Sequence, residues 1–294
     1  MIRIADGALR ALIVPEIGAG VARFDLERDG RTIPLFRPCL APDPDKPFDL
    51  ASFPMVPWSN RVSGGGFRFG DRFHPLEPNV AGQEFPLHGN GFALPWRVIA
   101  RDDTGVTLEL VTDGPGPFAY RALAGYTIGA AGLRATLRVE NRAAIRLPHG
   151  LGFHPWFART PLTTLHAPAT TVILENERKL PGARVPLQDK PGWDFTAPRR
   201  LPDERVNCAF DGWTGRARID WPERGLGLDI HADGGCRAYI VWSPGAGADF
   251  LCHEPVSHLV DAFNEPGGAE ANGLRALDPG GSFEISCTWR PVLR

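Results

Sequence analysis

Residues 126–140, YTIGAAGLRATLRVE, combine two short alternating segments with a glycine-bounded turn. From Leu133 to Glu140 every second residue is apolar, and a shorter segment of the same kind runs from Tyr126 to Ile128. In a strand, successive side chains point to opposite faces, so this period of two gives a strand one apolar face and one polar face. Residues 129–132, with a glycine at each end, supply turn chemistry. The stretch therefore predicts an antiparallel hairpin.

The same signature recurs along the chain. Further hairpins are predicted for residues 21–26 with 32–36, 66–69 with 72–76, and 97–101 with 106–111, and single strands for 217–221, 227–231, 238–242 and 283–289. The 29 prolines and 34 glycines leave hardly any window long enough for an amphipathic helix. We therefore expect an all-β fold, a large antiparallel β-sandwich. Without an internal repeat or a linker, residues 1–294 are predicted to form one domain.

Composition narrows the classes of function. The net charge is -2 and no basic run is present, so nucleic acid is not an expected partner. Charged residues interrupt the apolar N-terminus, which excludes a signal peptide or membrane span there and predicts a cytoplasmic protein without membrane contact. The five cysteines are an odd number without a C-x-x-C pair, which favours reduced thiols over disulfides or zinc. Oligomeric state is not predictable from these features.

Four polar clusters interrupt the alternating pattern and are predicted to lie in loops or at strand ends, at residues 59–61, 87–89, 149–156 and 252–255. Nucleotide, zinc-protease and serine-hydrolase motifs are absent from the sequence. The polar residues of the four clusters are mainly His, Glu and Arg, and aromatic residues lie beside them in the sequence. This combination suits a sugar ligand, because sugars stack on aromatic rings and form hydrogen bonds through their hydroxyl groups. Each cluster taken alone is equally compatible with a turn or a surface loop. The aromatic residues concerned are Trp58, Phe92, Trp96, Phe153, Trp156 and Phe157.

Taken together and in order, the clusters resemble the aldose 1-epimerase (galactose mutarotase) family. The resemblance extends over nearly the whole chain and many motifs occur in the same order, which makes it specific although each motif is short. The matching stretches are Asn60-Arg61-Val62, Gly66-Phe67, Leu76 to Asn79, Leu87-His88-Gly89, His154-Pro155-Trp156-Phe157, Glu254-Pro255, Asp261-Ala262-Phe263-Asn264 and Leu277-Asp278-Pro279-Gly280.

The resemblance implies a β-supersandwich of the galactose mutarotase type and an isomerase that needs no cofactor or metal. It implies that Glu254 is the general base and His154, protonated in the resting complex, the general acid. Arg61 and His88, with Asn60, would hold the substrate. A base at the anomeric hydroxyl and an acid at the ring oxygen are sufficient to open the ring, after which the aldehyde rotates and closes again as the other anomer.

One position departs from the family pattern. Where the family commonly has an Asp, in the region 205–213, this chain has Asn207. An amide can donate to and accept from a sugar hydroxyl, but it lacks the charge of a carboxylate. Asn207 is therefore expected to bind substrate, and whether nearby Asp211 replaces the missing carboxylate is left open by the sequence.

Three other functions are open at this stage. A glycoside-processing enzyme would need a second carboxylate beside Glu254, and Asp211 or Asp261 are the candidates. A sugar-binding protein without turnover would need only the pocket. A hexose-6-phosphate epimerase would need cations for the phosphate, for which Arg68 and Arg72 are candidates.

Several neighbouring residues are not assigned to the site. His149, His253 and His258 are left out because sequence neighbours in a strand point in opposite directions, and Cys252 is expected to be a small buried residue rather than a nucleophile.

Overall fold

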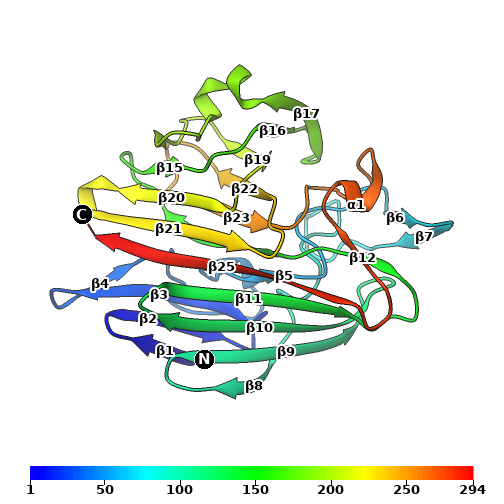
Figure 1. The fold of residues 1–294 in the computed structure, drawn as a ribbon, viewed down its shortest axis with the longest axis horizontal. Helices are drawn as coiled ribbons and strands as arrows, with labels where there is room; N and C mark the ends of the chain where they lie inside the picture. Colours follow the sequence, from blue (N-terminus) through cyan, green and yellow to red (C-terminus); the bar gives the residue numbers. More distant parts are fainter. Residues whose placement is uncertain (294) are drawn as a thin grey trace.

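The computed structural model describes residues 1–293 and contains a nine-stranded sheet, seen face-on in Figure 1. The hairpin predicted from residues 126–140 lies in it, with Gly129 paired to Gly132. In spatial order the strands are β18 (Arg199–Arg200), β15 (Thr164–His166), β20 (Arg216–Trp221), β21 (Leu226–Asp233), β25 (Ser282–Leu293), β11 (Gly132–Asn141), β10 (Ala119–Gly129), β9 (Gly105–Asp113) and β8 (Arg97–Arg101).

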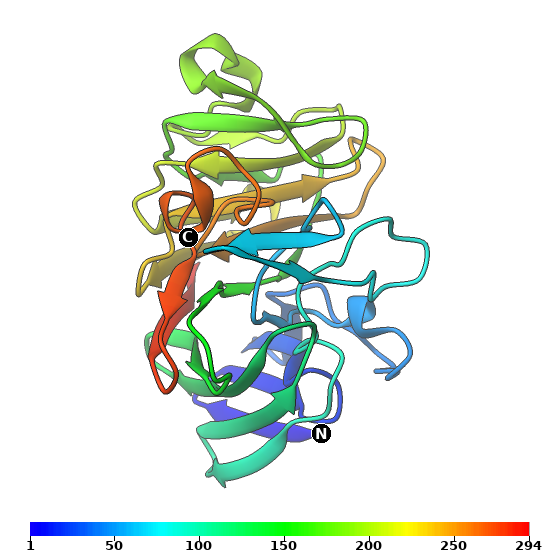
Figure 2. The same cartoon turned by 90° about the vertical axis from the view of Figure 1, so that its right-hand side faces the viewer.

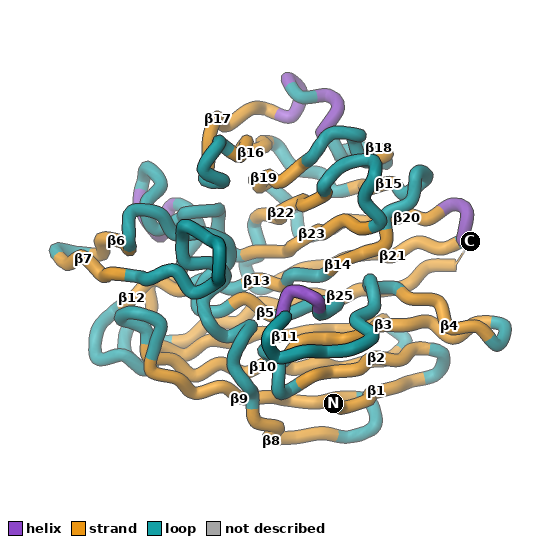
Figure 3. Tube along the Cα trace, turned by 180° about the vertical axis from the view of Figure 1, so that it is seen from behind, coloured by secondary structure: helices purple, strands orange, loops and turns teal. Residues whose placement is uncertain are grey.

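A second sheet of eight strands packs behind the first and is seen from its own side in Figure 3. Its path is β17 (Pro181–Pro186), β16 (Thr171–Glu175), β19 (Val206–Asp211), β22 (Ala238–Ser243), β23 (Phe250–Val256), β13 (Gly152–Phe153) and β5 (Pro54–Met55). The remaining strand, β14 (Trp156–Ala158), pairs with β23 off this path.

Smaller elements complete the molecule. A four-stranded sheet contains β1 (Ile2–Asp6), β2 (Leu9–Val14), β3 (Gly20–Arg28) and β4 (Arg31–Pro34), and two ribbons pair β6 (Gly66–Phe69) with β7 (Arg72–Pro75) and β12 (Leu147–His149) with β24 (Arg275–Leu277). Within the described residues, helical structure is limited to α1 (Gly268–Ala271) and the 3-10 turns η1 (Pro47–Asp49), η2 (Leu187–Asp189), η3 (Pro191–Trp193) and η4 (Pro222–Arg224). Named strands pair antiparallel throughout residues 1–293. The all-β antiparallel sandwich predicted from the sequence is confirmed.

The core fills the space between the layers that Figure 2 shows edge-on. Apolar residues of β10 and β11 alternate between buried and partly exposed positions, as the period of two predicts. Trp289 of β25 joins the layers, because its ring meets Phe36 at 5.2 Å and Phe153 at 5.9 Å in edge-to-face contacts. The inner face of the eight-stranded sheet therefore packs against the core. Its outer face is not used in this packing and can carry a site.

Strand β10 begins at Ala119, seven residues before the start predicted from the sequence. The added segment contains alanine and glycine, which are weak strand formers, and becomes a strand because β9 and β11 pair with it on both sides. All five cysteines are free and buried. Within the described part of the chain no helix is long and apolar enough to cross a membrane.

Candidate functional site

The outer face of the eight-stranded sheet carries the site. Cross-strand pairing places Glu254 opposite Ile240, and Trp242 opposite both Asn207 and Cys252. Since alternate residues of a strand share a face, the side chains of Asn207, Trp242 and Glu254 emerge on the same side. The prediction that Glu254 lies in a loop or at a strand end is wrong, because it lies inside β23. Because loops cover this face, β23 is buried on both sides. Its sequence therefore lacks the alternation of apolar and polar residues that marks a half-exposed strand.

A cavity of about 400 Å³ opens between this face and the covering loops. That volume is within the range of small-molecule sites. All six residues predicted for the site line it, namely Asn60, Arg61, His88, His154, Asn207 and Glu254. They come from two loops, the short segment between β13 and β14, and strands β19 and β23.

His154 and Glu254 form a buried pair at the cavity wall. The Nε2 atom of His154 lies 3.4 Å from Oε1 of Glu254, and the residues are 6% and 2% exposed. The imidazole stacks on the ring of Trp156, with centroids 4.0 Å apart. Because the ring is held in this way, the pair has a defined orientation toward the cavity. The two groups lie within ion-pair distance without a hydrogen bond between them, so each can direct its polar atom toward a ligand in the cavity.

Burial decides which of the two groups carries a proton. Desolvation lowers the pKa of His154 to about 3, and the nearby Arg37 charge acts in the same direction. Desolvation also raises the pKa of Glu254 well above 4.5, although the Arg61 charge opposes it. Both directions favour a neutral imidazole beside a protonated carboxyl. The expectation that His154 is already protonated at rest is therefore not favoured by its surroundings.

His88 faces the same cavity as a neutral hydrogen-bond donor. Its Nδ1 accepts a hydrogen bond of 2.9 Å from the backbone N–H of Asn60, so the proton of the neutral ring is assigned to Nε2. Burial lowers the pKa of His88 well below 6.5, and the neighbouring His154 and Arg61 add to the effect. Asn60 and His88 both have left-handed backbone, with φ of 58° and 59°. Such backbone at two site residues indicates that the surroundings hold these loops firmly.

Arg61 reaches the cavity as a positioned guanidinium. Its Nη1 and Nη2 donate to Oδ1 of Asn60 at 3.3 Å and to Oε1 of Gln83 at 3.1 Å. Burial lowers the pKa of Arg61, while the charges of Glu175 and Glu254 raise it. An arginine is still fully protonated after such a shift. Its remaining N–H groups are free to clamp oxygen atoms of a ligand.

Asn79 fixes the loop that carries His88. Its amide oxygen accepts from the backbone N–H of Leu87 at 2.7 Å, and its Nδ2 donates to the carbonyls of Leu87 at 2.9 Å and Gly89 at 2.5 Å. These bonds add to the single β-bridges that Leu87 forms with Arg61 and Gly89 forms with Val56. Asn79, which ends the Leu76 to Asn79 stretch noted in the sequence, therefore has a structural role in supporting the His88 loop.

We predict that Asn79→Ala lowers the free energy of unfolding by about 2 kcal/mol, because its three part-buried hydrogen bonds to backbone groups contribute roughly 1 kcal/mol each at most. Urea denaturation measures the change. Asn176→Ala is the matched control, since Asn176 also bonds several backbone groups but in an exposed turn, and should cost less than about 1 kcal/mol. Equal losses in the two variants would contradict the supporting role of Asn79.

Asp261 and Asn264 play a comparable structural role. Oδ1 of Asp261 accepts from the Ser63 N–H at 2.9 Å, and Nδ2 of Asn264 donates to that same oxygen at 3.0 Å and to the Gly66 carbonyl at 3.1 Å. The Asp261 N–H in turn donates to the carbonyl of Arg61 at 3.2 Å. These bonds hold the loop that follows Arg61 and keep the Asp261 carboxylate away from the cavity lining.

Asn207 is bound to a carboxylate that sequence reasoning missed. Its Nδ2 donates to Oε1 of Glu175, and Nη1 of Arg205 donates to Oε2 of the same carboxylate at 2.6 Å. Glu175 ends β16, next to β19, so the two side chains meet across neighbouring strands. Asn207 therefore directs its carbonyl oxygen elsewhere, and that oxygen is an acceptor available to a ligand.

Asp211 does not replace the missing carboxylate. It lies four residues further along β19, a distance of roughly 13 Å at 3.3 Å per residue. Its carboxylate pairs with Arg237 at 3.2 Å and Arg184 at 3.8 Å. The negative charge nearest Asn207 is that of Glu175, which no pattern near residue 207 could have shown.

We predict that Asn207→Asp weakens ligand binding in the cavity several-fold and lowers Tm, because a second carboxylate would then face Glu175 without a donor between them. Adding Glu175→Gln supplies a donor again and should restore both quantities toward the wild-type values. Ligand titration and thermal unfolding measure the effects. A double variant no better than Asn207→Asp alone would show that the Asn207–Glu175 bond has no influence on binding.

The aromatic lining differs in part from the one expected. Trp156 lines the cavity as predicted from its place in the sequence, together with Phe48 and Trp242, which were not predicted for the site. The other aromatic candidates lie outside the lining: Trp58, Phe92, Trp96, Phe153 and Phe157. Trp242 could have been found, because it closes a predicted strand that pairs with the segment carrying Asn207.

The neighbouring histidines lie outside the cavity lining. Nε2 of His258 accepts from the Ser59 N–H at 2.9 Å, and Nδ1 of His149 lies 2.9 Å from the Leu147 carbonyl. His253 points to the opposite side of β23 from Glu254 and stacks on Tyr239 at 4.6 Å. These three side chains support the walls.

A group of three potential metal ligands occurs at the acid/base pair. Side-chain atoms of His154, Cys252 and Glu254 lie within 4.8 Å of one another. Burial raises the pKa of the Cys252 thiol well above 9.0, and the Glu254 charge adds to the shift. A nucleophile must be a thiolate, so this buried thiol is poorly suited to nucleophilic attack.

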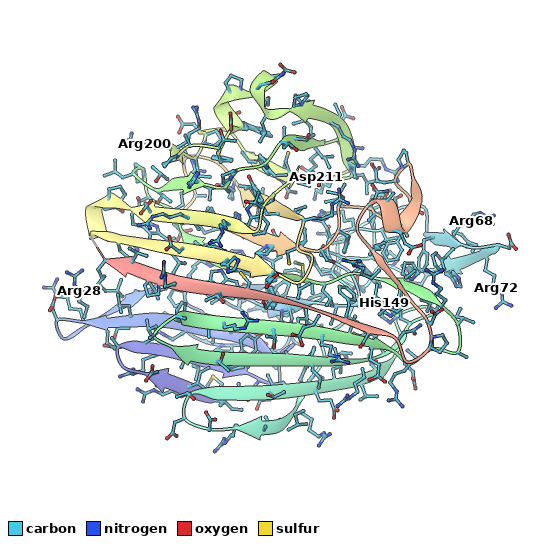
Figure 4. The ribbon with its side chains drawn as sticks, in the orientation of Figure 1. Arg28, Arg68, Arg72, His149, Arg200 and Asp211 are labelled. Carbon is cyan, nitrogen blue, oxygen red and sulfur yellow. The ribbon has the colours of Figure 1, made fainter. Side chains whose placement is uncertain are left out.

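Arg68 and Arg72, the candidate cations for a phosphate in the hexose-6-phosphate alternative, lie elsewhere. Figure 4 shows both on the β6–β7 ribbon, which projects from the edge of the molecule. Neither residue lines the cavity. The arginines that do line it are Arg37, Arg61 and Arg205, with Lys179 as a fourth cation.

Fold and site define an all-β sandwich protein with a buried His–Glu pair in a polar cavity. The family model for aldose 1-epimerase matches residues 1–289, so the chain belongs to the aldose 1-epimerase family. The Escherichia coli K12 protein YphB is 35% identical over 243 residues, which are 80% of this chain and 81% of YphB.

Solved structures agree with this assignment. The crystal structure of a candidate aldose 1-epimerase from Escherichia coli K12 superimposes with a TM-score of 0.90 at 31% identity, covering 99% of this chain and 98% of the other. A Caenorhabditis elegans homologue of the aldose epimerases gives a TM-score of 0.82 at 16% identity, covering 99% and 98%, and shows the shared fold.

Proposed function

We propose that the protein is an aldose 1-epimerase that interconverts the α and β anomers of a sugar by acid/base catalysis through ring opening. The observation that carries the proposal is the His154–Glu254 pair, with Nε2 and Oε1 3.4 Å apart, on the wall of a cavity lined by hydrogen-bonding side chains. Anomer exchange needs one group that accepts a proton and one that gives a proton at two neighbouring oxygens. An imidazole and a carboxyl group on the same cavity wall can supply one role each.

The pair becomes catalytic when its proton lies on His154. A sugar whose anomeric hydroxyl donates to Glu254 favours the carboxylate, as does the charge of Arg61. Glu254 then accepts the anomeric proton while His154 protonates the ring oxygen, and the bond between that oxygen and the anomeric carbon breaks. After rotation of the aldehyde, the two groups exchange roles and the ring closes.

The remaining polar residues hold the sugar. His88 donates from Nε2, Arg61 donates through its guanidinium and Asn207 accepts at its carbonyl oxygen. Trp156 and Trp242 offer ring faces to the apolar side of the sugar. Each contact is compatible with either anomer, because none is assigned to the anomeric hydroxyl itself.

We predict that kcat/KM is level as pH falls from about 8 to about 5. Because burial lowers the pKa of His154 to about 3, the pair takes up a second proton only at much lower pH than an ordinary histidine with a pKa near 6.5. At high pH, activity falls when the pair loses its one proton. A pH–rate profile checks this, with circular dichroism at each pH to confirm folding. A decline centred near pH 6.5 would contradict the proton assignment.

A glycosidase function has less support. The partners considered for Glu254 were Asp211, which is ion-paired elsewhere, and Asp261, which is used in a loop. Neither lines the cavity. The spacing of two carboxylates across a scissile bond is therefore not provided by these residues.

Polarimetry tests the proposal. Freshly dissolved α-glucose and α-galactose should approach their equilibrium rotation faster with the protein than in buffer. If the rate equals that of buffer for both sugars and for their C6-anionic derivatives, the epimerase proposal fails. Quenching of tryptophan fluorescence by the same sugars would then identify a binding protein, because Trp156 and Trp242 line the cavity.

A further inference from the structure

A cationic wall lies along one side of the cavity. The guanidinium of Arg37 lies over the Phe250 ring at 4.9 Å, and that of Arg205 lies over the Trp242 ring at 5.0 Å. The two rings contact each other edge-to-face at 6.3 Å. Arg37, Phe250, Trp242 and Arg205 thus form a continuous surface, with a guanidinium at each end.

The side-chain N–H groups of Arg37 have no hydrogen-bond acceptor among the described residues. Within residues 1–293 its side chain forms no hydrogen bond and no ion pair within 4 Å, although it is half-buried and lines the cavity. Its guanidinium is instead held between aromatic rings, since it also lies over Trp156 at 5.5 Å. A planar fork held in this way is ready to bind an acceptor at little further entropic cost.

The charges around the cavity favour an anion. Arg37, Arg61, Lys179 and Arg205 line it, against the carboxyl groups of Asp49 and Glu254. Glu175, beyond this lining, is bound to Arg205 and Asn207 and balances the charge of Arg205, so the excess positive charge rests on Arg37, Arg61 and Lys179. A substrate with a negative charge would balance the excess, whereas a neutral sugar would leave it uncompensated.

The position of Arg37 indicates which part of a sugar it would meet. Arg37 contacts Trp156, and Trp156 stacks on His154, the residue proposed to act at the ring oxygen. The ring oxygen has two carbon neighbours, the anomeric carbon and the carbon that bears the exocyclic arm. Since Glu254 occupies the side of the anomeric hydroxyl, the arm is the group left to extend toward Arg37.

We propose that this cationic wall is an anion subsite and that the substrate is an aldose whose exocyclic arm ends in a carboxylate or a phosphate monoester. The inference rests on the proposed epimerase function and adds the substrate class. Arg37 would bind the anion through paired N–H donors, and Arg205 and Lys179 would strengthen the field from the same cavity.

Kinetics with three sugars test the subsite. We expect kcat/KM for glucose 6-phosphate or for glucuronate to exceed that for glucose by about tenfold to a hundredfold, the range for a charge-assisted hydrogen bond. The two anionic sugars distinguish phosphate from carboxylate recognition. Anomer exchange can be followed by polarimetry or by NMR exchange spectroscopy. If glucose is turned over as efficiently as both anionic sugars, the inference is overturned without any variant.

Variants locate the effect. Arg37→Gln should reduce the ratio of anionic to neutral kcat/KM by on the order of tenfold or more, whereas Arg68→Gln, a matched change on the projecting β6–β7 ribbon, should leave the ratio as in wild type. Equal losses for all three sugars in Arg37→Gln would show a structural role and overturn the inference.

Binding separates this inference from the epimerase proposal. If no sugar is turned over, fluorescence titration of wild type and Arg37→Gln with glucose 6-phosphate and glucuronate still tests the subsite. Binding of either anionic sugar by wild type, with loss in Arg37→Gln, would support the anion subsite while the epimerase proposal fails. The absence of any preference over glucose would overturn the subsite.

Discussion

Glu254→Gln is expected to lower kcat for anomer exchange by about 10²- to 10⁴-fold, the range for loss of a general acid or base. The amide keeps the shape of the carboxyl group and its hydrogen-bonding capacity, but it cannot accept the anomeric proton. KM should change little, because Arg61, His88 and Asn207 still hold the sugar. Stopped-flow polarimetry with the best substrate measures both constants.

The same variant should fold at least as well as wild type. Glu254 is 2% exposed, and burial already disfavours its charged form. A neutral amide removes that cost, so Tm should be equal or higher. Glu284→Gln, an exposed change on β25, is the control for a carboxyl-to-amide substitution elsewhere. Retention of wild-type kcat in Glu254→Gln would exclude this carboxyl as the base.

His154→Asn is expected to have a loss of similar size, about 10²- to 10⁴-fold in kcat. The ring oxygen then receives no proton as its bond to the anomeric carbon breaks. Because the imidazole also stacks on Trp156, some destabilisation is expected, and Tm is measured alongside the rate. His166→Asn, on strand β15 away from the cavity, is the control.

The double variant tests whether the two residues act as one unit. Groups that share a catalytic step have non-additive effects, so Glu254→Gln combined with His154→Asn should be hardly slower than either single variant. Kinetics of all four proteins complete the cycle. Losses that multiply would indicate two independent contributions and would contradict a shared catalytic step.

Much of the fold could be predicted from periodicity and turns, because hairpins such as residues 126–140 carry both signals in one continuous stretch. Sheet order could not, since β25 lies between β21 and β11, strands far apart in the sequence. Short strands such as β13 and β5 have only two residues each and depend on neighbours for their pairing.

For the site, the sequence and the family resemblance pointed to six residues that line the cavity, but they missed other lining residues and part of the surroundings. Glu175 was missed because it meets Asn207 only through the pairing of β16 and β19. The proton position at His154 was also beyond sequence, since it depends on burial, which a motif does not reveal. Arg37 was missed because nothing beside it in the chain marks it as part of a site.

The position of Glu254 in the middle of β23 limits how the chain can vary in length. Adding one residue within 250–256 would shift the register of β23 by one residue, so that each side chain beyond the insertion faces the opposite side of the sheet. The His253 imidazole would then face the cavity, and the Glu254 carboxyl group would face Tyr239. Insertions in the connection at residues 244–249 would leave that register intact. Homologues that keep the His154–Glu254 pair should therefore vary in the length of residues 244–249 but not in the length of β23. The site thus depends on the spacing of residues along the strand as well as on their identity.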